Sequence, residues 1–383
     1  MNRIIVAPDS FKESLTAAEV ASCVADGIRR VLPAAEVIQI PLSDGGEGLT
    51  DALISGTGGR YMDREVTGPL GNKVTARFGV LGDNRTAVIE MAAASGLALV
   101  PREERNPMIT TTYGTGELIK AALDLGCRRM IVGIGGSATN DGGSGMAEAL
   151  GVKLLDADGK RIGPGAAGLL TLHTIDMSAA DPRLPEAEIM VACDVTNHLC
   201  GPTGASYVYG RQKGADSEML PVMDQGLLNL ARVIKHDIGI EVQELSGAGA
   251  AGGLGAGLVA FAGGKLRSGL GMVFEILDFE SRLATGVDLV ITGEGQINTQ
   301  TLYGKVPAGV ARLAKKYRLP VLAIAGSIGP GADKAYETGI DAIMSITPGP
   351  ISLDESMARA GELISDAAAR AMRLIILRRK MGQ

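Results

Sequence analysis

The chain of 383 residues is too long for one core of ordinary size, so two domains of roughly 100–200 residues each are expected. The net charge of −6 excludes a polycationic surface for nucleic acid, and 3% aromatic residues without Trp argue against base-stacking clefts. Four cysteines without a C-x-x-C pair predict free thiols in the cytoplasm, and the first residues lack the pattern of a secretory signal. The uncharged stretch 246–264 is mostly Gly and Ala, which is too little hydrocarbon to span a membrane.

The first sixty residues alternate between strand and helix signals. Residues 3–7 predict a short buried strand, and Thr16 with Glu19 has the pattern of a capping box. Apolar residues at helical spacing follow the box as far as Pro33, and residues 37–40 predict a second strand.

The middle of the chain has a different pattern. Turn-linked strands of alternating polarity are expected at 65–67, 74–80 and 86–90. Helix and strand signals then resume, and the clearest of them is a strand at 129–134. The last third returns to the opening pattern, with strands expected at 287–292, 320–325 and 342–347, a helix at 307–317, and one long amphipathic helix capped by Ser352 and Glu355.

Strands that alternate with helices predict a parallel sheet with helices on both faces. We therefore expect an α/β fold with two unlike domains. Residues 1–60 and 287–383 would form a Rossmann-like domain, a three-layer parallel sheet built from both chain ends. Residues 61–286 would form an inserted domain of mixed α/β structure.

The segment from Gly135 to Gly143 combines four glycines with two hydroxyls, an amide and an acid, between a strand and a helical pattern. Glycines let backbone N–H groups approach an oxyanion, and an acid can hold Mg²⁺ or a sugar hydroxyl. The simpler interpretation is a tight strand-to-helix turn, although a turn needs fewer polar side chains. No P-loop sequence occurs anywhere in the chain.

Four further loops place an acid where a strand is expected to end: 7–12, 43–48, 193–197 and 292–296. In open α/β sheets, ligands bind outside the carboxyl ends of the strands, so these loops could converge on one crevice. Each of them alone is only a turn with an acid in it.

A dinucleotide fingerprint is the main competing interpretation. Residues 133–138 fit G-x-G-x-x-A after a strand, and Asp156 and Asp158 lie at about the distance expected of a ribose-binding acid. Chance matches are common in a chain with 54 glycines. A nicotinamide-dependent oxidoreductase and a non-catalytic carboxylate-binding protein therefore remain alternatives.

Taken together, these loops resemble the bacterial glycerate kinases that are unrelated to P-loop kinases. The resemblance runs from about residue 6 to 311, through APDSFKESL, SDGGEG, GIGGSATNDGG, CDVTN, GPTGASYVYGRQKGA, GAAGGLGAG and TGEGQINTQTLYGKVPAGVA. It implies two unlike α/β domains and an ATP- and Mg²⁺-dependent kinase that acts on D-glycerate, with 2-phosphoglycerate as the product of the enterobacterial members. Asn298 departs from the family, where similar sequences usually carry Asp.

Phosphoryl transfer needs a phosphate clamp, cationic neutralisation and an acid–base group. We expect Asp194 to be the base, with Asp9 the runner-up, although either acid could instead cap a helix. Mg²⁺ would lie against Asp44, Glu47 or Asp194. Substrate anions would contact Ser10, Lys12, Arg211, Lys213 and Lys305, and Lys12 could also act in catalysis. The nucleotide phosphates are assigned to Gly135, Gly136, Ser137, Thr139, Asn140, Asp141, Gly142 and Gly143.

The residue pattern leaves several properties open. It does not distinguish 2- from 3-phosphorylation, because that choice depends on the placement of two neighbouring hydroxyls. A homodimer is one option for the assembly.

Overall fold

The computed structural model describes residues 2–302 and 304–381. The chain divides into two compact units. Unit 1 comprises residues 1–44, 51–57 and 270–383, and unit 2 comprises residues 45–50 and 58–269. The sequence predicted domain boundaries near residues 60 and 286. In the structure the chain passes between the units at 57/58 and at 269/270, and the short segment 45–50 also belongs to unit 2.

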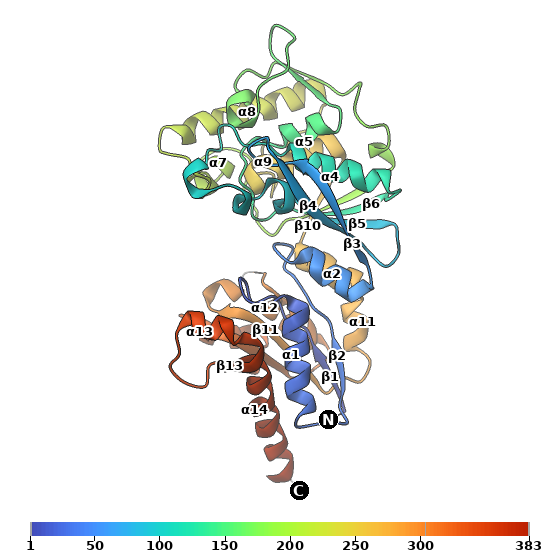
Figure 1. The fold of residues 1–383 in the computed structure, drawn as a ribbon, viewed down its shortest axis with the longest axis vertical. Helices are drawn as coiled ribbons and strands as arrows, with labels where there is room; N and C mark the ends of the chain where they lie inside the picture. The colour runs from blue at the N-terminus through green and yellow to red at the C-terminus, as the bar shows by residue number, and fades with distance from the viewer. Residues whose placement is uncertain (1, 303, 382–383) are drawn as a thin grey trace. The chain divides into compact units, whose positions relative to one another are not determined.

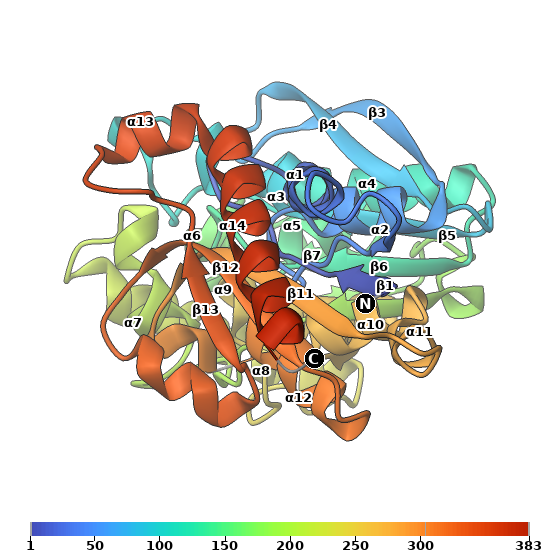
Figure 2. The same ribbon diagram turned by 90° about the horizontal axis from the view of Figure 1, so that it is seen from below.

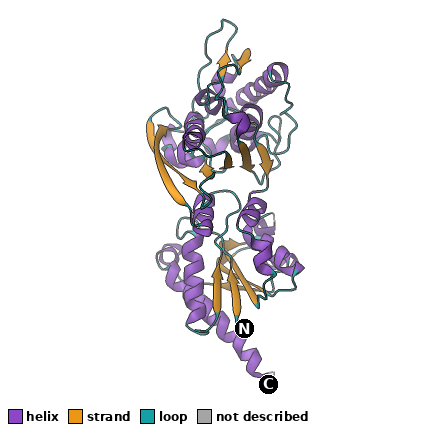
Figure 3. Cartoon of the chain, turned by 90° about the vertical axis from the view of Figure 1, so that its right-hand side faces the viewer, coloured by secondary structure: helices purple, strands orange, loops and turns teal. Residues whose placement is uncertain are grey.

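Unit 1 contains a parallel sheet of five strands in the order β13-β12-β11-β1-β2. Helices cover both faces of this sheet (Figure 3). Its strands are β1 (Arg3–Val6), β2 (Glu36–Gln39), β11 (Leu289–Ile297), β12 (Val321–Ile328) and β13 (Ala342–Ser345). Its helices are α1 (Ala17–Arg29), α10 (Gly269–Ile276), α11 (Phe279–Leu283), α12 (Val306–Lys316), α13 (Leu353–Ala358) and α14 (Ala360–Met381), and α2 (Leu49–Thr57) crosses a boundary between the units.

Successive side chains along a β-strand point to opposite faces of the sheet, so alternate residues of each strand pack under different helices. Ile4 and Val6 of β1 pack with Ile291 of β11 under α1 and α14. These two helices lie side by side although they come from opposite ends of the chain (Figure 1, Figure 2). Ile5 and Val290 alternate with those residues and are fully buried on the other face, where α12 packs on β11. The expected Rossmann-like sheet from both chain ends is confirmed.

Local signals in unit 1 behave largely as expected. The capping box is present, because Thr16 accepts from the amide of Glu19 and Glu19 accepts from the amide of Thr16. The prediction of one continuous C-terminal helix was wrong. Arg359 leaves helical geometry (φ −107°, ψ 14°), so the structure has two separate helices, α13 and α14.

Unit 2 is built on a mixed sheet of six strands in the order β10-β9-β6-β5-β4-β3, in which β4 pairs antiparallel with both β3 and β5. Its strands are β3 (Arg60–Thr67), β4 (Lys73–Val80), β5 (Thr86–Glu90), β6 (Arg129–Gly133), β9 (Glu188–Ala192) and β10 (Lys265–Arg267), with a small pair β7 (Lys153–Leu155) and β8 (Thr174–Asp176). Its helices are α3 (Ala92–Ser95), α4 (Tyr113–Asp124), α5 (Ser144–Ala149), α6 (Gly165–Leu169), α7 (Ala205–Tyr209), α8 (Met219–Asp237) and α9 (Ala250–Ala262).

The uncharged Gly-rich stretch forms α9, whose side chains are almost all buried in the unit 2 core. Residues Ala251–Gly253 leave helical geometry with positive φ, which glycine tolerates best. Among the described residues, no helix combines the length and the apolar character that a membrane crossing requires.

Candidate functional site

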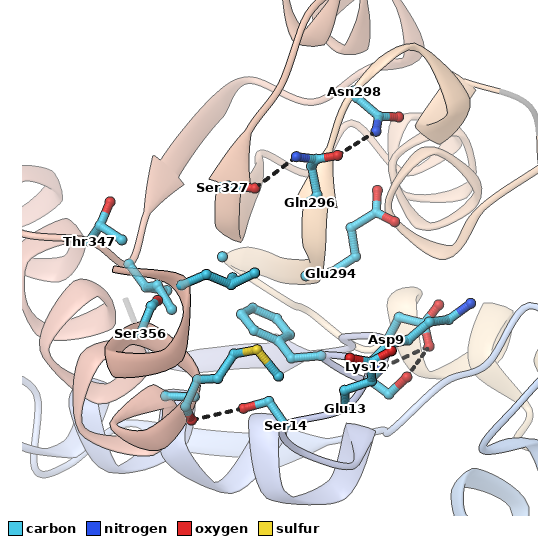
Figure 4. A pocket seen from close by; sticks show the side chains of 18 of the residues that line it. Asp9, Lys12, Glu13, Ser14, Glu294, Gln296, Asn298, Ser327, Thr347 and Ser356 are labelled. Atoms are coloured by element: carbon cyan, nitrogen blue, oxygen red, sulfur yellow. Dashed lines mark hydrogen bonds between the residues drawn. The ribbon is translucent and has the colours of Figure 1, made fainter. Parts of the chain in front are cut away.

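The strand order of the unit 1 sheet reverses between β1 and β11. The chain adds β2 beside β1 on one side, whereas β12 and β13 extend from β11 on the other. Strand connections diverge at such a switch point, and the crevice beyond the carboxyl ends is the usual ligand site of open α/β sheets. A cavity of about 630 Å³ opens there, lined by residues that follow β1, by β11 and by α13 (Figure 4).

Four carboxylates contribute to this cavity: Asp9 and Glu13 after β1, Asp44 after β2, and Glu294 within β11. Burial is the main cause that raises the pKa of Asp9 from 3.8 to about 7, and the charges of Asp44 and Glu294 add to it. The amide of Ser10, which donates to Asp9 Oδ1 at 2.7 Å, and the charge of Lys12 oppose the shift. A carboxyl group with a pKa near neutrality can accept and release a proton at physiological pH.

Glu294 is held in place by two neighbours. The Thr301 hydroxyl donates to Oε1 at 2.5 Å, and the Lys305 ammonium lies 3.3 Å from Oε2. Burial nevertheless raises the pKa of Glu294, and the charge of Asp44 contributes to the same direction. Glu294 is therefore held by a hydrogen bond at Oε1 and by an ion pair with Lys305 at Oε2.

Two lysines bring positive charge to the same cavity. Lys12 is exposed on the loop after β1, and Lys305 occupies the N-cap position of α12. Within the described residues, no side chain caps α12, so its first amides keep their partial positive charge. Figure 4 shows Lys12 beside Asp9, with Glu294 above them. Of the predicted substrate contacts, Ser10, Lys12 and Lys305 are brought together here.

The prediction that residues 292–296 form a loop is wrong, because this segment continues strand β11. Its backbone pairs with β12, with Gly293 opposite Ile324 and Gln296 opposite Ser327. Glycine is needed at 293 because a Cβ there would collide with the carbonyl oxygen of Ile324. The longer strand carries Glu294 into the cavity.

Asn298 orders the turn that follows β11. Its side-chain amide donates to Gln296 Oε1 at 2.9 Å, and its Oδ1 accepts from the amide of Gln300 at 2.8 Å. Gln296 in turn donates to the Ser327 hydroxyl at 3.0 Å, which ties the turn to β12 (Figure 4). An aspartate could accept from Gln300 but could not donate to Gln296.

In unit 2, the segment Gly135–Gly143 is only partly accessible. Gly135 and Gly136 are exposed, whereas Ser137 to Gly143 are buried. The amide of Gly142 donates to the carbonyl oxygen of Gly252 at 3.0 Å, and that of Gly143 donates to Asp141 at 3.1 Å. The amides of Gly142 and Gly143 were expected to bind phosphate. Both already donate hydrogen bonds within the protein, so they are not available to a phosphate in this structure.

Asp141 is a structural acid rather than an open ligand. It is fully buried, and its two oxygens accept from the hydroxyl and amide of Thr112 and from the amides of Gly143 and Gly145. Burial raises its pKa, and these four bonds oppose the rise. Asn140 is likewise buried and donates to Ser206.

Lys213 is buried with 1% of its surface exposed. Its ammonium donates to Ser137 Oγ at 2.8 Å and to the carbonyl oxygen of Thr139 at 2.6 Å. Burial lowers the pKa of Lys213 to about 7, and the charge of Asp141 opposes that change. Lys213, which was predicted to contact a substrate anion, is bonded in the structure to the loop itself, at Ser137 and Thr139.

The other predicted residues of unit 2 are exposed. Asp194 follows β9 and accepts from the amide of Gly269 at 3.1 Å. Arg211 donates to the Ser217 hydroxyl at 3.2 Å, and Glu47 lies on the surface. Within residues 2–302 and 304–381, no three His, Cys, Asp or Glu side chains are placed to hold a metal ion. The assignment of Mg²⁺ to Asp44, Glu47 or Asp194 stays a prediction.

The dinucleotide interpretation is wrong in its geometry. A fingerprint loop must lead directly into a helix N-terminus. Here Ser137 instead bridges to Gly96, and α5 begins only at Ser144. Asp156 accepts from the amides of Asp158 and Lys160, so it shapes a tight turn after β7.

Several cavity residues were not singled out from the sequence. Glu294 carried a signal, since it lies in a Gly-Glu-Gly phrase after an apolar run, but it was named only as part of a loop. The hydroxyl and apolar residues of α13 and of the segment between β13 and α13 carried no signal of a ligand site, because turns and amphipathic helices of this composition are common, and Ser352 was named only as a helix cap: Ile346, Thr347, Ile351, Ser352, Leu353, Ser356 and Met357.

The comparisons with known proteins agree with this architecture. The model of the glycerate kinase family matches residues 4–376. A glycerate kinase of Bacillus subtilis is 52% identical and a glycerate 2-kinase of Escherichia coli is 50% identical, each over 96% of both chains. The crystal structure of a protein assigned as glycerate kinase 2 from Salmonella typhimurium LT2 matches 99% of both chains with a TM-score of 0.91 and 48% identity. The chain belongs to the glycerate kinase family.

Proposed function

We propose that this protein transfers the γ-phosphate of ATP to D-glycerate and forms 2-phosphoglycerate. The E. coli relative that shares half of its residues is named a glycerate 2-kinase. The observation that carries the proposal is the cavity at the switch point of unit 1, where Asp9, Glu294, Lys12 and Lys305 meet. A phosphoryl transfer to an alcohol needs both of these side-chain types: an acid–base group and cations for the phosphates.

Asp9 is the better candidate for the general base. Its pKa of about 7 suits a group that must be ionised before reaction and protonated after it. Asp194, which the sequence favoured, is exposed and bonds to the amide of Gly269. In the proposed reaction, the carboxylate of Asp9 accepts the proton of the glycerate hydroxyl as the oxygen attacks the γ-phosphorus, and the bond from the γ-phosphorus to the β–γ bridging oxygen breaks to release ADP.

Lys12 and Lys305 would neutralise the substrate anions. The Lys12 side chain is exposed, whereas the Lys305 side chain is positioned by its ion pair with Glu294. The N-terminus of α12 adds partial positive charge beside Lys305. Gly135 and Gly136 stay candidates for a backbone contact to phosphate, since they are exposed glycines.

Mg²⁺ fits this site as a phosphate-bound ion. It binds through one or two protein carboxylates and substrate phosphates rather than a full protein cage, which agrees with the lack of a three-ligand cluster among the described residues. Asp44 is the predicted ligand that lines the cavity. When bound, Mg²⁺ would neutralise charge that develops on the phosphates.

We also infer a cytoplasmic enzyme of small-molecule metabolism. Cys23, Cys127, Cys193 and Cys200 are all free thiols, as expected in a reducing compartment. The predicted homodimer stays a prediction that sedimentation of the purified protein can test.

The test is ³¹P NMR of the product made from ATP and D-glycerate. We expect a 2-phosphoglycerate signal, distinct from that of the 3-isomer. Asp9→Asn should lower kcat by roughly 10²–10⁴ with small changes in both KM values, because proton transfer is lost and binding is kept. Asp194→Asn is the matched control and should stay within about threefold of the wild type.

Two results would contradict the assignment. If Asp194→Asn were the inactive variant and Asp9→Asn stayed active, Asp194 would be the base. If D-glycerate raised the Tm without any phosphorylated product, the protein would be a carboxylate binder and not a kinase.

A further inference from the structure

The unit 1 cavity has two chemically different ends. Asp9, Lys12 and Glu294 form the charged end, on the right of Figure 4, while Thr347 and Ser356 lie on the left. Four large apolar residues close to Thr347 and Ser356 in the sequence also line the cavity: Ile346, Ile351, Leu353 and Met357.

D-glycerate matches only the charged end. It consists of a carboxylate and two hydroxyls on three carbons, so it has almost no apolar surface to place against isoleucine or leucine. At the ~30 Å³ that a water molecule occupies in the liquid, its seven heavy atoms would fill roughly 200 Å³. The cavity of about 630 Å³ is therefore about three times larger than this substrate.

The nucleotide supplies what glycerate lacks. Of the two substrates in the proposed reaction, only ATP carries a large uncharged group, the planar adenine ring. Small-molecule sites combine apolar walls with a few polar groups that fix orientation, and the hydroxyls of Thr347 and Ser356 lie at the apolar end (Figure 4).

We propose that the apolar end of this cavity, formed by Ile346, Ile351, Leu353 and Met357, binds the adenine base of ATP and directs its phosphates toward Lys12 and Lys305. This inference rests on the proposed kinase function and assigns the nucleotide to unit 1. It replaces the sequence-based assignment of the phosphates to the buried part of Gly135–Gly143.

Leu353 makes the proposal testable. It lines the cavity and is 73% exposed, so most of its apolar surface is in contact with solvent. Burial against a flat base would remove part of this surface from water. Because the side chain is so exposed, a substitution there leaves the fold intact.

The experiment compares Leu353→Asp with Leu374→Asp. Leu374 is a leucine in α14 that is 61% exposed and does not contribute to the cavity, so it controls for the same chemical change. Calorimetric titrations with ADP and with inorganic tripolyphosphate, both with Mg²⁺, separate the base from the phosphates. Leu353→Asp should weaken ADP binding by roughly tenfold or more and leave tripolyphosphate binding within about twofold.

Steady-state kinetics give a second measurement. Leu353→Asp should raise the KM for ATP by a similar factor while the KM for D-glycerate stays within about twofold, and Leu353→Ala should show a smaller effect in the same direction. Leu374→Asp should behave like the wild type in every measurement.

Three outcomes would overturn the base subsite: equal weakening of ADP and tripolyphosphate, no weakening of either, or a selective rise in the KM for D-glycerate. Failure of the proposed function is a separate result, since the wild-type protein would then bind ADP without phosphorylating glycerate. The ADP titrations do not require turnover, so they test the subsite in either case.

Discussion

Asp9 keeps its proton to a much higher pH in the folded protein than in the unfolded chain. Its pKa rises from 3.8 to about 7, chiefly through burial. Between these values the folded state binds more protons than the unfolded state, so this group makes stability fall as the pH rises from about 4 to 7. A shift of about three units corresponds to a penalty on the order of 4 kcal/mol above pH 7.

Asp9→Asn removes this penalty. We expect the variant to be more stable than the wild type at pH 8, and the difference in Tm to shrink toward pH 5. The measurement is thermal unfolding of both proteins across this pH range. A difference in Tm that is constant with pH would mean that Asp9 ionises normally in the folded state.

Lys213 supports a second prediction at this scale. Lys213→Met removes the donor to Ser137 Oγ and to the carbonyl oxygen of Thr139, both of which are buried. Each acceptor left without a partner costs about 1–3 kcal/mol. Removal of the amine also relieves the cost of burying it, which the lowered pKa of Lys213 reflects, and this relief shrinks as the pH rises from about 7 toward 10. Urea unfolding at neutral and at alkaline pH measures both effects, and the loss of unfolding free energy in Lys213→Met should be larger at alkaline pH.

Lys235→Met is the control for this change. Lys235 lies on α8 with a side chain that is 67% exposed, paired with Glu241 on the surface. Surface pairs contribute little, so its unfolding free energy should change by less than about 1 kcal/mol. If the free energy of unfolding fell by the same amount in both variants, the buried contacts of Lys213 would contribute no more to stability than a surface ion pair.

Individual residues were predictable only where their signal is local. Asp9, Ser10 and Lys12 were found because an acid and a cation directly follow a strand. The bond from Lys213 to Ser137 joins residues 76 positions apart, and no spacing rule predicts it. Lys213 was therefore assigned to a ligand, although it serves the loop itself.

At the scale of elements, α1 and α14 approach each other unusually closely at Gly27. A Cβ at this position would collide with the carbonyl oxygen of Ser365 and lie 2.7 Å from the Cβ of Ala368. Gly27→Ala should therefore destabilise the protein by about 1–3 kcal/mol, although the same change in an open helix stabilises it.

The control for Gly27→Ala is Gly349→Ala. No atom lies within 4 Å of the Cβ position of Gly349 in the described part of the chain, so this substitution should be neutral or slightly stabilising. Chemical denaturation of both variants decides the matter. A stabilised Gly27→Ala protein would mean that the two helices separate easily.

Most elements follow from local patterns. Alternating apolar runs located β1, β6 and β12 within a few residues, and the capping box located the start of α1. The extension of β11 through Gln296 was missed because Gly-Glu-Gly is typical of a turn. Pairing with β12, a tertiary interaction, determines its conformation instead.

At the scale of the whole molecule, the buried residues of the unit 2 core that the structure describes lie between Val66 and Ala262, and Met62 and Leu266 pack against them. We expect a fragment of residues 45–269 to fold alone, with a cooperative urea transition followed by circular dichroism. A fragment of residues 270–383 is the contrasting case, because it contains β11, β12 and β13 but lacks β1 and β2. Non-cooperative unfolding of fragment 45–269 would contradict this independence.

The pairing of β1 with β11 has a consequence for biosynthesis. Ile4 lies opposite Leu289, so 285 residues separate partners that sit next to each other in the sheet. At translation rates of about 5–20 residues per second, the first strand waits roughly 15–60 s on the ribosome for its neighbour. The nascent chain thus carries an exposed apolar strand while its middle section can already be compact. The unit 1 cavity, which β11 and α13 line, therefore forms last, and a polypeptide released early would lack it.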